Sequence, residues 1–148
     1  TIPECEKQNL LLLLRVAAKQ LASVRWYITA GTLLGAVRNK SHIPDETDIN
    51  IAVHESDWGR LASIDELHTT SYPYRLFLSR ANRVHINFWK VIIKGDMAYE
   101  HGIALPVSLL FPTKVCEYEH NFYPCPRNSR KWVEMQNVSR GGVDILWA

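Results

Sequence analysis

The stretch that decides the fold runs from Tyr27 to Val53 and reads YITAGTLLGAVRNKSHIPDETDINIAV. Its first part is a β-rich run that ends in Ala30-Gly31-Thr32 and continues into an apolar segment, which predicts a strand followed by a helix. The free backbone N–H groups at the start of such a helix, together with the helix dipole, favour an anion there. We therefore expect a phosphate-binding turn at this point of the chain.

Two side chains of this turn suit a phosphate ligand. Gly31 has no Cβ, so a phosphate can approach the backbone closely, and the hydroxyl of Thr32 can cap the helix or donate to the anion. The stretch places an acidic loop only a few residues further on.

The second part of the stretch is the acidic run Asp45-Glu46-Thr47-Asp48 followed by Ile49-Asn50-Ile51-Ala52-Val53. In a strand, residues two apart share a face, so Asp48 and Asn50 are expected to point one way while Ile49, Ile51 and Val53 point into the core. A pair of oxygen-bearing side chains on a strand is a plausible mount for a divalent cation.

Together these features resemble the LicD/fukutin family of phosphotransferases, which has the nucleotidyltransferase fold. The resemblance rests on Gly-Thr-Leu-Leu-Gly-Ala-Val-Arg, on Ile-Pro, and on the acidic cluster before Asp-hydrophobic-X-hydrophobic. The family order is Gly-Thr-Leu-Leu-Gly, then Ile-Pro-Trp-Asp-Asp-Asp-Ile-Asp. Here Asp45 stands in place of Trp, Glu46 and Thr47 in place of carboxylates, and Asn50 in place of the last Asp, whereas Asp48 is retained.

A third family carboxylate comes from a neighbouring strand, where this chain has Asn87 within His85-Ile86-Asn87-Phe88-Trp89. The resemblance implies that Asp48, Asn50 and Asn87 are metal ligands for Mg²⁺ or Mn²⁺. It implies catalytic roles for Asp48, Asn50 and Glu46. The substrate and phosphate contacts would come from Gly31, Thr32, Gly35, Arg38 and Lys114.

The resemblance implies metal-dependent transfer of a phospho-substituent, such as phosphocholine or a sugar or polyol phosphate. The donor would be nucleotide-activated, for example a CDP-linked group, and the acceptor a glycan. Because two expected carboxylates are amides, an inactive homologue that binds nucleotide or glycan is an alternative. A third interpretation treats the acidic loop as ordinary solvated surface.

Size and composition predict one domain over residues 1–148. The 148 residues are 47% hydrophobic, which is enough for one core but too little for two domains. A formal net charge of +2 gives no reason to expect nucleic acid as a partner. The longest leucine run spans only residues 10–14, so any membrane anchor would lie outside this sequence.

The cysteines leave several arrangements open. Cys116 and Cys125 could form one disulfide, remain free thiols, or join His120 and a further ligand in a zinc site, although the spacing fits no compact zinc signature. Glycosylation sequons at Asn39 and Asn137 favour the lumen of the ER or Golgi, or another part of the secretory pathway.

Outside the central stretch, periodicity and turn residues predict the remaining elements. We expect helices over residues 3–24, 56–67 and 128–136, a hairpin of strands over 74–78 and 83–93, an irregular segment over 94–105, and strands near 113–119 and 122–126. The fold class is α/β (α+β), with a nucleotidyltransferase-like mixed β-sheet flanked by helices.

Overall fold

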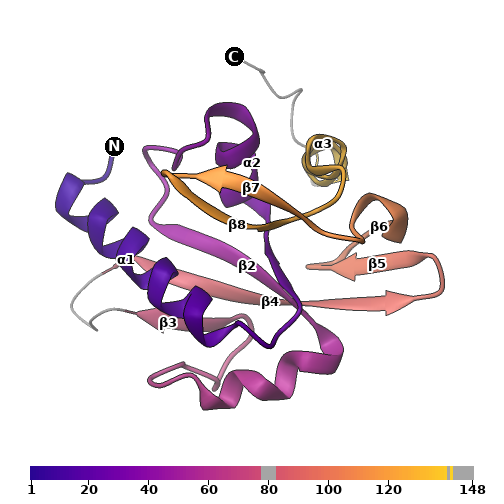
Figure 1. The fold of residues 1–148 in the computed structure, drawn as a ribbon, viewed down its shortest axis with the longest axis horizontal. Helices are drawn as coiled ribbons and strands as arrows, with labels where there is room; N and C mark the ends of the chain where they lie inside the picture. Colours follow the sequence, from indigo (N-terminus) through magenta and orange to yellow (C-terminus); the bar gives the residue numbers. More distant parts are fainter. Residues whose placement is uncertain (78–82, 140, 142–148) are drawn as a thin grey trace.

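The computed structural model describes residues 1–77, 83–139 and 141 (Figure 1). Its elements, in chain order, are α1 (Glu4–Gln20), β1 (Trp26–Ile28), α2 (Ala30–Asn39), β2 (Asp48–His54), the 3-10 helix η1 (Glu55–Ser63), β3 (Tyr74–Phe77), β4 (His85–Lys94), β5 (Met97–Glu100), β6 (Ile103–Pro106), the 3-10 turn η2 (Val107–Leu109), β7 (Lys114–Tyr118), β8 (Asn121–Cys125) and α3 (Ser129–Ser139). None of the helices in these ranges is long and apolar enough to cross a bilayer.

The main sheet has six strands in the order β1-β2-β4-β5-β6, with β3 also paired to β4. Only β2 and β4 run parallel, and the other pairs are antiparallel. The predicted mixed sheet flanked by helices is confirmed. Strands β7 and β8 form a separate antiparallel pair.

Strand β2 is covered on both of its faces. Residues 49–53 are all buried, so the face that carries Asn50 is covered as well as the face that was expected to point into the core. Helix α1 packs against β2 and β4, and α2 packs against β2, β7 and α3. The face that carries Asp48 and Asn50 therefore lies beneath other elements and is only partly open to solvent.

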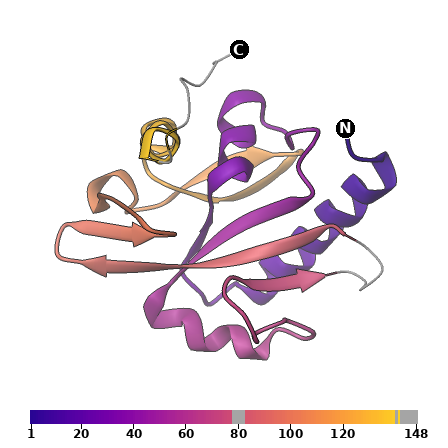
Figure 2. The same ribbon diagram turned by 180° about the vertical axis from the view of Figure 1, so that it is seen from behind.

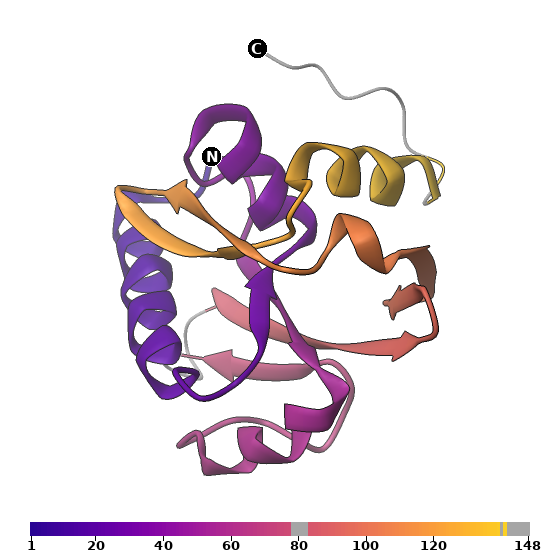
Figure 3. The ribbon, with the colours of Figure 1, turned by 45° about the vertical axis from the view of Figure 1, so that its right-hand side comes forward.

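The helices surround the sheet from several directions. Figure 3 shows α1 on the left of the sheet, α2 and α3 side by side above it, and the β7–β8 hairpin below α2. The reverse view in Figure 2 shows η1 at the end of the sheet remote from α2. This arrangement leaves the N-terminal turn of α2 directly beside the middle of β2.

One predicted element is shorter than expected and one is wrong. The helix predicted over 56–67 is present as the 3-10 helix η1, which ends at Ser63. The segment expected to be irregular over 94–105 forms the antiparallel strands β5 and β6. Gly95 and Gly102 adopt positive φ values of 59° and 76° at the two reversals, so these glycines mark hairpin turns and do not end regular structure. The predicted connection over 79–82 lies outside the described residues.

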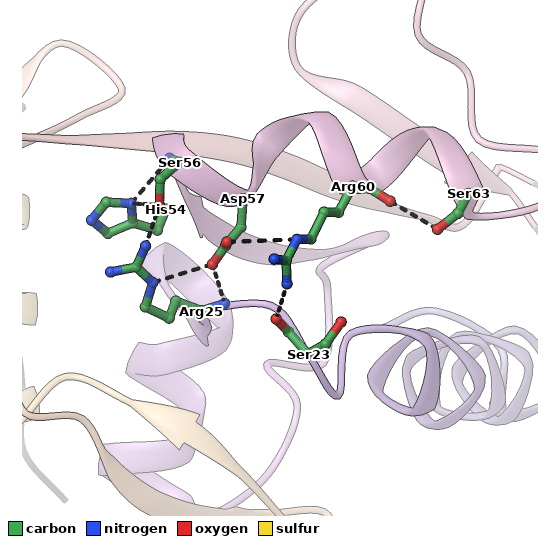
Figure 4. Close-up of polar contacts among 7 residues, drawn as sticks. All are labelled: Ser23, Arg25, His54, Ser56, Asp57, Arg60 and Ser63. Atoms are coloured by element: carbon green, nitrogen blue, oxygen red, sulfur yellow. Dashed lines mark hydrogen bonds and ion pairs between the residues drawn. The ribbon is translucent and has the colours of Figure 1, made fainter.

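A buried carboxylate fastens η1 to the chain that enters β1 (Figure 4). Asp57 Oδ2 accepts hydrogen bonds from the Arg25 backbone N–H at 2.8 Å and from Arg25 Nε at 3.2 Å. Arg60 Nε lies 3.9 Å from the other oxygen, Oδ1, and Arg60 Nη1 donates to the Ser23 carbonyl at 2.7 Å. The Arg25 guanidinium also contacts the Ser56 hydroxyl. Asp57 thus joins two segments more than thirty residues apart.

We expect Asp57→Asn to lower the free energy of unfolding at neutral pH by about 1.5–3 kcal/mol, because hydrogen bonds to a charged group are lost. The hydrogen bond from the Arg25 backbone is the main cause that lowers the pKa of Asp57, and the Arg25 side chain adds to it. A carboxyl with a lowered folded pKa stabilises above its unfolded pKa of about 3.9, and this stabilisation is lost as the pH falls through the folded pKa. The difference in the free energy of unfolding between the two proteins, measured by urea denaturation, should therefore shrink as the pH falls below about 3.9 and disappear below the folded pKa of Asp57. If the difference in the free energy of unfolding between the original protein and Asp57→Asn did not change with pH, the stabilising role of the Asp57 carboxylate would be contradicted.

Cys116 and Cys125 form a disulfide that joins β7 to β8. Of the three arrangements considered from the sequence, the structure therefore has the disulfide, and neither sulfur is a free thiol or a zinc ligand. Cys5 is a free and exposed cysteine. The bond lies within the hairpin whose strand β8 packs against β1. It therefore stabilises a layer that covers one side of the main sheet.

Reduction of the disulfide is expected to lower the free energy of unfolding by about 2–3 kcal/mol, because the bond closes a loop of roughly ten residues in the unfolded chain. Urea denaturation with and without dithiothreitol measures the effect. Cys5→Ala is the matched control, and it should show the same sensitivity to the reductant as the original protein. An unchanged midpoint after verified reduction would contradict the prediction.

Candidate functional site

The parallel pairing of β2 with β4 brings the predicted metal ligands together. Asn50 lies opposite Asn87, and Asp48 lies opposite His85. Asn87 Nδ2 donates to Asp48 Oδ2 at 2.8 Å and lies 3.4 Å from Asn50 Oδ1. Trp89, two residues further along β4, donates from Nε1 to Asn50 Oδ1 at 2.9 Å. Asp48, Asn50 and Asn87 thus form one polar cluster on adjacent strands.

Glu46 extends this cluster to the start of α2. A Cβ placed on Gly31 would lie 3.1 Å from Glu46 Oε1, so this carboxylate rests against the first turn of the helix. Burial, followed by the negative charge of Asp48 and a hydrogen bond with it, raises the pKa of Glu46. The two carboxyl groups therefore repel each other at neutral pH, and a cation between them would relieve that repulsion.

The acidic loop is held in place by His42, a residue that no pattern in the sequence singles out. The His42 ring is buried, with Nδ1 2.7 Å from Tyr118 Oη and Nε2 2.7 Å from the Glu46 carbonyl oxygen. Because a carbonyl only accepts, Nε2 must carry the proton of this hydrogen bond. The His42 backbone N–H donates to Glu119 Oε2 at 2.7 Å. Strand β7 and the turn after it thus position Glu46 from seventy residues away.

The start of α2 is shaped by Thr29, Ala30 and Thr32. Thr29 is the N-cap residue, but its side chain makes no capping hydrogen bond. Ala30 has a φ of 52°, in the left-handed region that a non-glycine residue occupies only at a cost of about 1–2 kcal/mol. The buried hydroxyl oxygen of Thr32 accepts from the Asn50 backbone N–H at 2.9 Å, which joins α2 directly to β2. The first N–H groups of the helix are left without a side-chain cap.

The other three predicted phosphate contacts lie elsewhere. Gly35 is buried on the second turn of α2, with its Cα facing the Ser41 carbonyl oxygen. Arg38 is half-buried in the last turn, roughly 10 Å along the helix axis from Gly31. Lys114 is exposed at the first residue of β7, in the separate two-stranded sheet. The structure therefore groups Gly31 and Thr32 with the cluster and places Gly35 and Arg38 further along the helix.

The cluster offers oxygen atoms of the kind that Mg²⁺ and Mn²⁺ prefer. Its donors are the Glu46 and Asp48 carboxylates and the amide oxygens of Asn50 and Asn87. Asn87 is 5% exposed, and its Oδ1 is buried without a hydrogen-bond partner. No three His, Cys, Asp or Glu side chains gather as a cation site within the described ranges. The residues thus fit a hard cation, with lower charge than a site of three carboxylates.

A buried glutamate on β5 adjoins the cluster. It was not predicted as a site residue because it lies in the segment expected to be irregular. Glu100 is 2% exposed. Its carboxyl group accepts from Tyr27 Oη at 2.7 Å, from Thr29 Oγ1 at 2.9 Å and from Gln136 Nε2 at 2.6 Å. It therefore links β1, the N-cap of α2 and helix α3. The Thr29 hydroxyl bonds to Glu100 and not to the helix.

Glu100 also lines a small cavity of about 120 Å³ beside Asn50. The other lining residues are Thr29, Ala30, Trp89 and His101. The cavity thus extends from the N-terminus of α2 to the β4–β5 pair. A ligand at the polar cluster has this space on one side.

Comparison with known proteins identifies relatives of the central stretch. Residues 23–73 match the family described as LicD/FKTN/FKRP, nucleotidyltransferase domain. This range contains Gly31, Glu46, Asp48 and Asn50, whereas Asn87 lies beyond it. Human and mouse ribitol 5-phosphate transferase FKRP are each 21% identical to this chain over 143 residues, covering 82% of the chain and 29% of each relative. The chain spans less than a third of the length of these relatives.

Proposed function

With its predicted relation to the LicD/FKTN/FKRP family confirmed over residues 23–73, we propose that this chain takes part in the transfer of a phosphate-linked group to a glycan. The observation that supports this best is the convergence of Glu46, Asp48, Asn50 and Asn87 beside the uncapped first turn of α2. Two strands and a helix N-terminus thereby present oxygen ligands and free N–H groups to one place. A nucleotide-activated donor with a phosphocholine, sugar-phosphate or polyol-phosphate group fits this arrangement.

In this proposal the first turn of α2 binds a phosphate of the donor through its backbone N–H groups. Glu46, Asp48 and the free Oδ1 of Asn87 would hold Mg²⁺ or Mn²⁺, with Asn50 beside them. When bound, such a cation would neutralise the phosphate charge and align the attacking and leaving oxygens of the transfer. The Glu46 carboxylate rests against Gly31, so its negative charge would repel a phosphate bound at this turn. A cation held by Glu46 would offset that repulsion.

A second candidate function is a binding domain without catalysis, and one hydrogen bond favours it. The Asn87 amide donates to Asp48 at 2.8 Å, so the cluster is partly satisfied without any cation. An aspartate at position 87 would instead repel Asp48. In this alternative the site retains affinity for a nucleotide or glycan but has lost the charge needed for efficient metal binding.

Thermal unfolding with Mn²⁺, with a cytidine nucleotide, and with both together tests the proposal. A ligand that binds only the folded state must raise the midpoint by mass action. The transferase proposal expects a shift with Mn²⁺ and a larger one with both ligands. A shift with nucleotide that Mn²⁺ does not increase would support the binding domain. No shift under any condition would contradict the transferase proposal and a nucleotide-binding domain, and would leave only a glycan-binding domain.

We also propose that the chain works in the secretory pathway. The Cys116–Cys125 disulfide supports this, because such bonds persist in oxidising compartments and are rare in the cytosol. The sequon at Asn39 is on an exposed residue at the end of α2. Mass spectrometry of the protein secreted from cultured animal cells, with and without glycosidase, tests the placement.

A further inference from the structure

A second and larger cavity lies next to the candidate site. It has a volume of about 450 Å³ and is lined by Tyr72, Lys90, Ile92, Tyr99, His101 and Gly102, a set that we name the aromatic groove. This volume lies in the range of small-ligand sites and can take one or two sugar-sized rings. None of the residues predicted from the sequence to form the site lines it.

The aromatic groove adjoins the smaller cavity beside the polar cluster. His101 lines both the groove and the 120 Å³ cavity, which is also lined by Asn50 and Glu100. The His101 ring centroid lies 3.9 Å from that of Trp89, and Trp89 Nε1 donates to Asn50 Oδ1 at 2.9 Å. A ligand in the groove would therefore lie close to the cluster, with His101 and Trp89 beside it.

The aromatic rings of the groove are exposed and yet held in place. Tyr72 is 52% exposed and Tyr99 is 41% exposed. The Tyr72 hydroxyl oxygen accepts from the Lys90 backbone N–H at 2.8 Å, and its ring packs edge-on against Trp89 at 5.7 Å. Lys94 Nζ lies 5.7 Å from the centre of the Tyr99 ring. Rings fixed in this way lose little conformational freedom when a flat ligand binds to them.

The charges around the groove distinguish between an anionic and a neutral ligand. Lys90 Nζ lies 5.1 Å from the Trp58 ring centre, so its charge already has an aromatic partner. The adjoining cavity is lined by Glu100 and, among the residues that the structure describes, by no Lys or Arg side chain. Such a lining offers a phosphate no positive charge. A neutral sugar has the apolar C–H face and the hydroxyl groups that this combination suits.

We propose that the aromatic groove is a binding subsite for one uncharged sugar ring. The ring packs on Tyr72 and Tyr99, next to His101, which also lines the small cavity beside the polar cluster. That the sugar belongs to the glycan acceptor rests on the proposed function. The binding of the ring itself does not.

Saturation-transfer NMR on the whole chain tests this subsite without metal or nucleotide. The probes are methyl glycosides of glucose, galactose, mannose, xylose and N-acetylglucosamine. We expect at least one to bind with a Kd of roughly 1 mM, as befits about a dozen heavy atoms, and to show saturation on its ring protons. Tyr99→Ala and Tyr72→Ala should each weaken it at least about fivefold, because each removes an aromatic face.

Phe122→Ala is the matched control, since Phe122 is a 66% exposed aromatic residue on β8, outside the groove. It should leave sugar binding unchanged. Tyr72→Phe keeps the ring and removes only the hydroxyl, so it separates loss of the aromatic face from disturbance of β4. The subsite proposal would be overturned if none of the glycosides showed NMR saturation transfer. It would also be overturned if the saturation transfer were unaffected by both alanine variants.

A nucleotide arm separates this proposal from the preceding one. If cytidine monophosphate binds with the same dependence on Tyr72 and Tyr99 while the glycosides do not bind, the groove is a nucleotide site and the sugar proposal is wrong. Sugar binding together with no response to Mn²⁺ or nucleotide in the thermal experiment would leave the subsite in place and contradict the transferase function.

Discussion

Gly35→Ala is expected to lower the free energy of unfolding by about 3 kcal/mol or more, beyond the usual cost of overpacking, and the melting temperature by about 6–12 °C. A Cβ on Gly35 would lie 2.3 Å from the Ser41 carbonyl oxygen and 3.4 Å from Ile43 Cγ1. The first contact is with backbone, so no side-chain rotation relieves it. The Ser41 N–H also donates to the Gly35 carbonyl at 3.2 Å, which holds the two segments against each other.

The loop that Gly35 supports leads to the candidate site, so the substitution should also affect ligand binding. Lys40 has a φ of 56° and turns the chain at the end of α2, and His42 then fixes the Glu46 carbonyl. Displacement of Ser41 would move these residues together. We therefore expect any thermal shift that Mn²⁺ or nucleotide produces to be lost in Gly35→Ala.

Two other glycines provide controls for this prediction. A Cβ on Gly59 would meet nothing within 4 Å, so Gly59→Ala should change stability by less than about 1 kcal/mol. At Gly31 the contact is with the flexible end of Glu46, which can move, so Gly31→Ala should fold normally and alter the cluster. Chemical denaturation of the three variants measures the order of their stabilities. A stable Gly35→Ala protein would show that the loop is free to move away from α2.

Asn50→Asp is expected to tighten Mn²⁺ binding by about 10–100-fold, and Asn50→Asp with Asn87→Asp by more than either change alone. Each substitution adds a full negative charge beside a dication, which amounts to several kcal/mol of gross attraction at about 4 Å in an effective dielectric of about 20. Solvation offsets much of this attraction. Isothermal titration calorimetry of each variant measures the affinity without any assay of activity.

The two substitutions should differ in their effect on the protein without Mn²⁺. An aspartate at position 50 also adds a negative charge near Asp48, but it still accepts from Trp89 Nε1 and Asn87 Nδ2, so its cost should be smaller than that of Asn87→Asp. An aspartate at position 87 loses the donor to Asp48 and adds a like charge beside it, which should cost about 1–3 kcal/mol. Mn²⁺ should restore most of that stability.

Asn128→Asp is the charge-matched control for these variants. Asn128 is exposed and its Oδ1 accepts the Lys131 backbone N–H at the start of α3, a position where aspartate serves equally well. It should leave Mn²⁺ affinity unchanged. If Asn50→Asp also leaves it unchanged, the cation does not bind at the β2–β4 cluster and our placement is wrong.

The sequence predicted much of the fold from local patterns. The turn at Ala30-Gly31-Thr32 does begin a helix, and the alternation from Asp48 to Val53 does form a strand, because both signals depend on residues close together in the chain. The glycines at 95 and 102 gave an equally local signal. A glycine with positive φ at a hairpin turn cannot be distinguished, from sequence alone, from a glycine that ends regular structure. The sequence therefore predicts an irregular segment where the structure has two hairpin turns.

The sequence alone therefore determined which side chains bear oxygen and that a strand–helix turn lies beside them. Only the tertiary structure decided that Asn87 pairs with Asp48, that His42 and Tyr118 hold the acidic loop, and that Glu100 adjoins the cluster. It also decided that a Cβ on Gly35 would clash with the Ser41 backbone, whereas a Cβ on Gly31 would meet only the flexible Glu46 side chain. The physical reason is that each of these depends on contacts between segments far apart in the chain, set by strand pairing and packing, which leave no periodic pattern in the sequence.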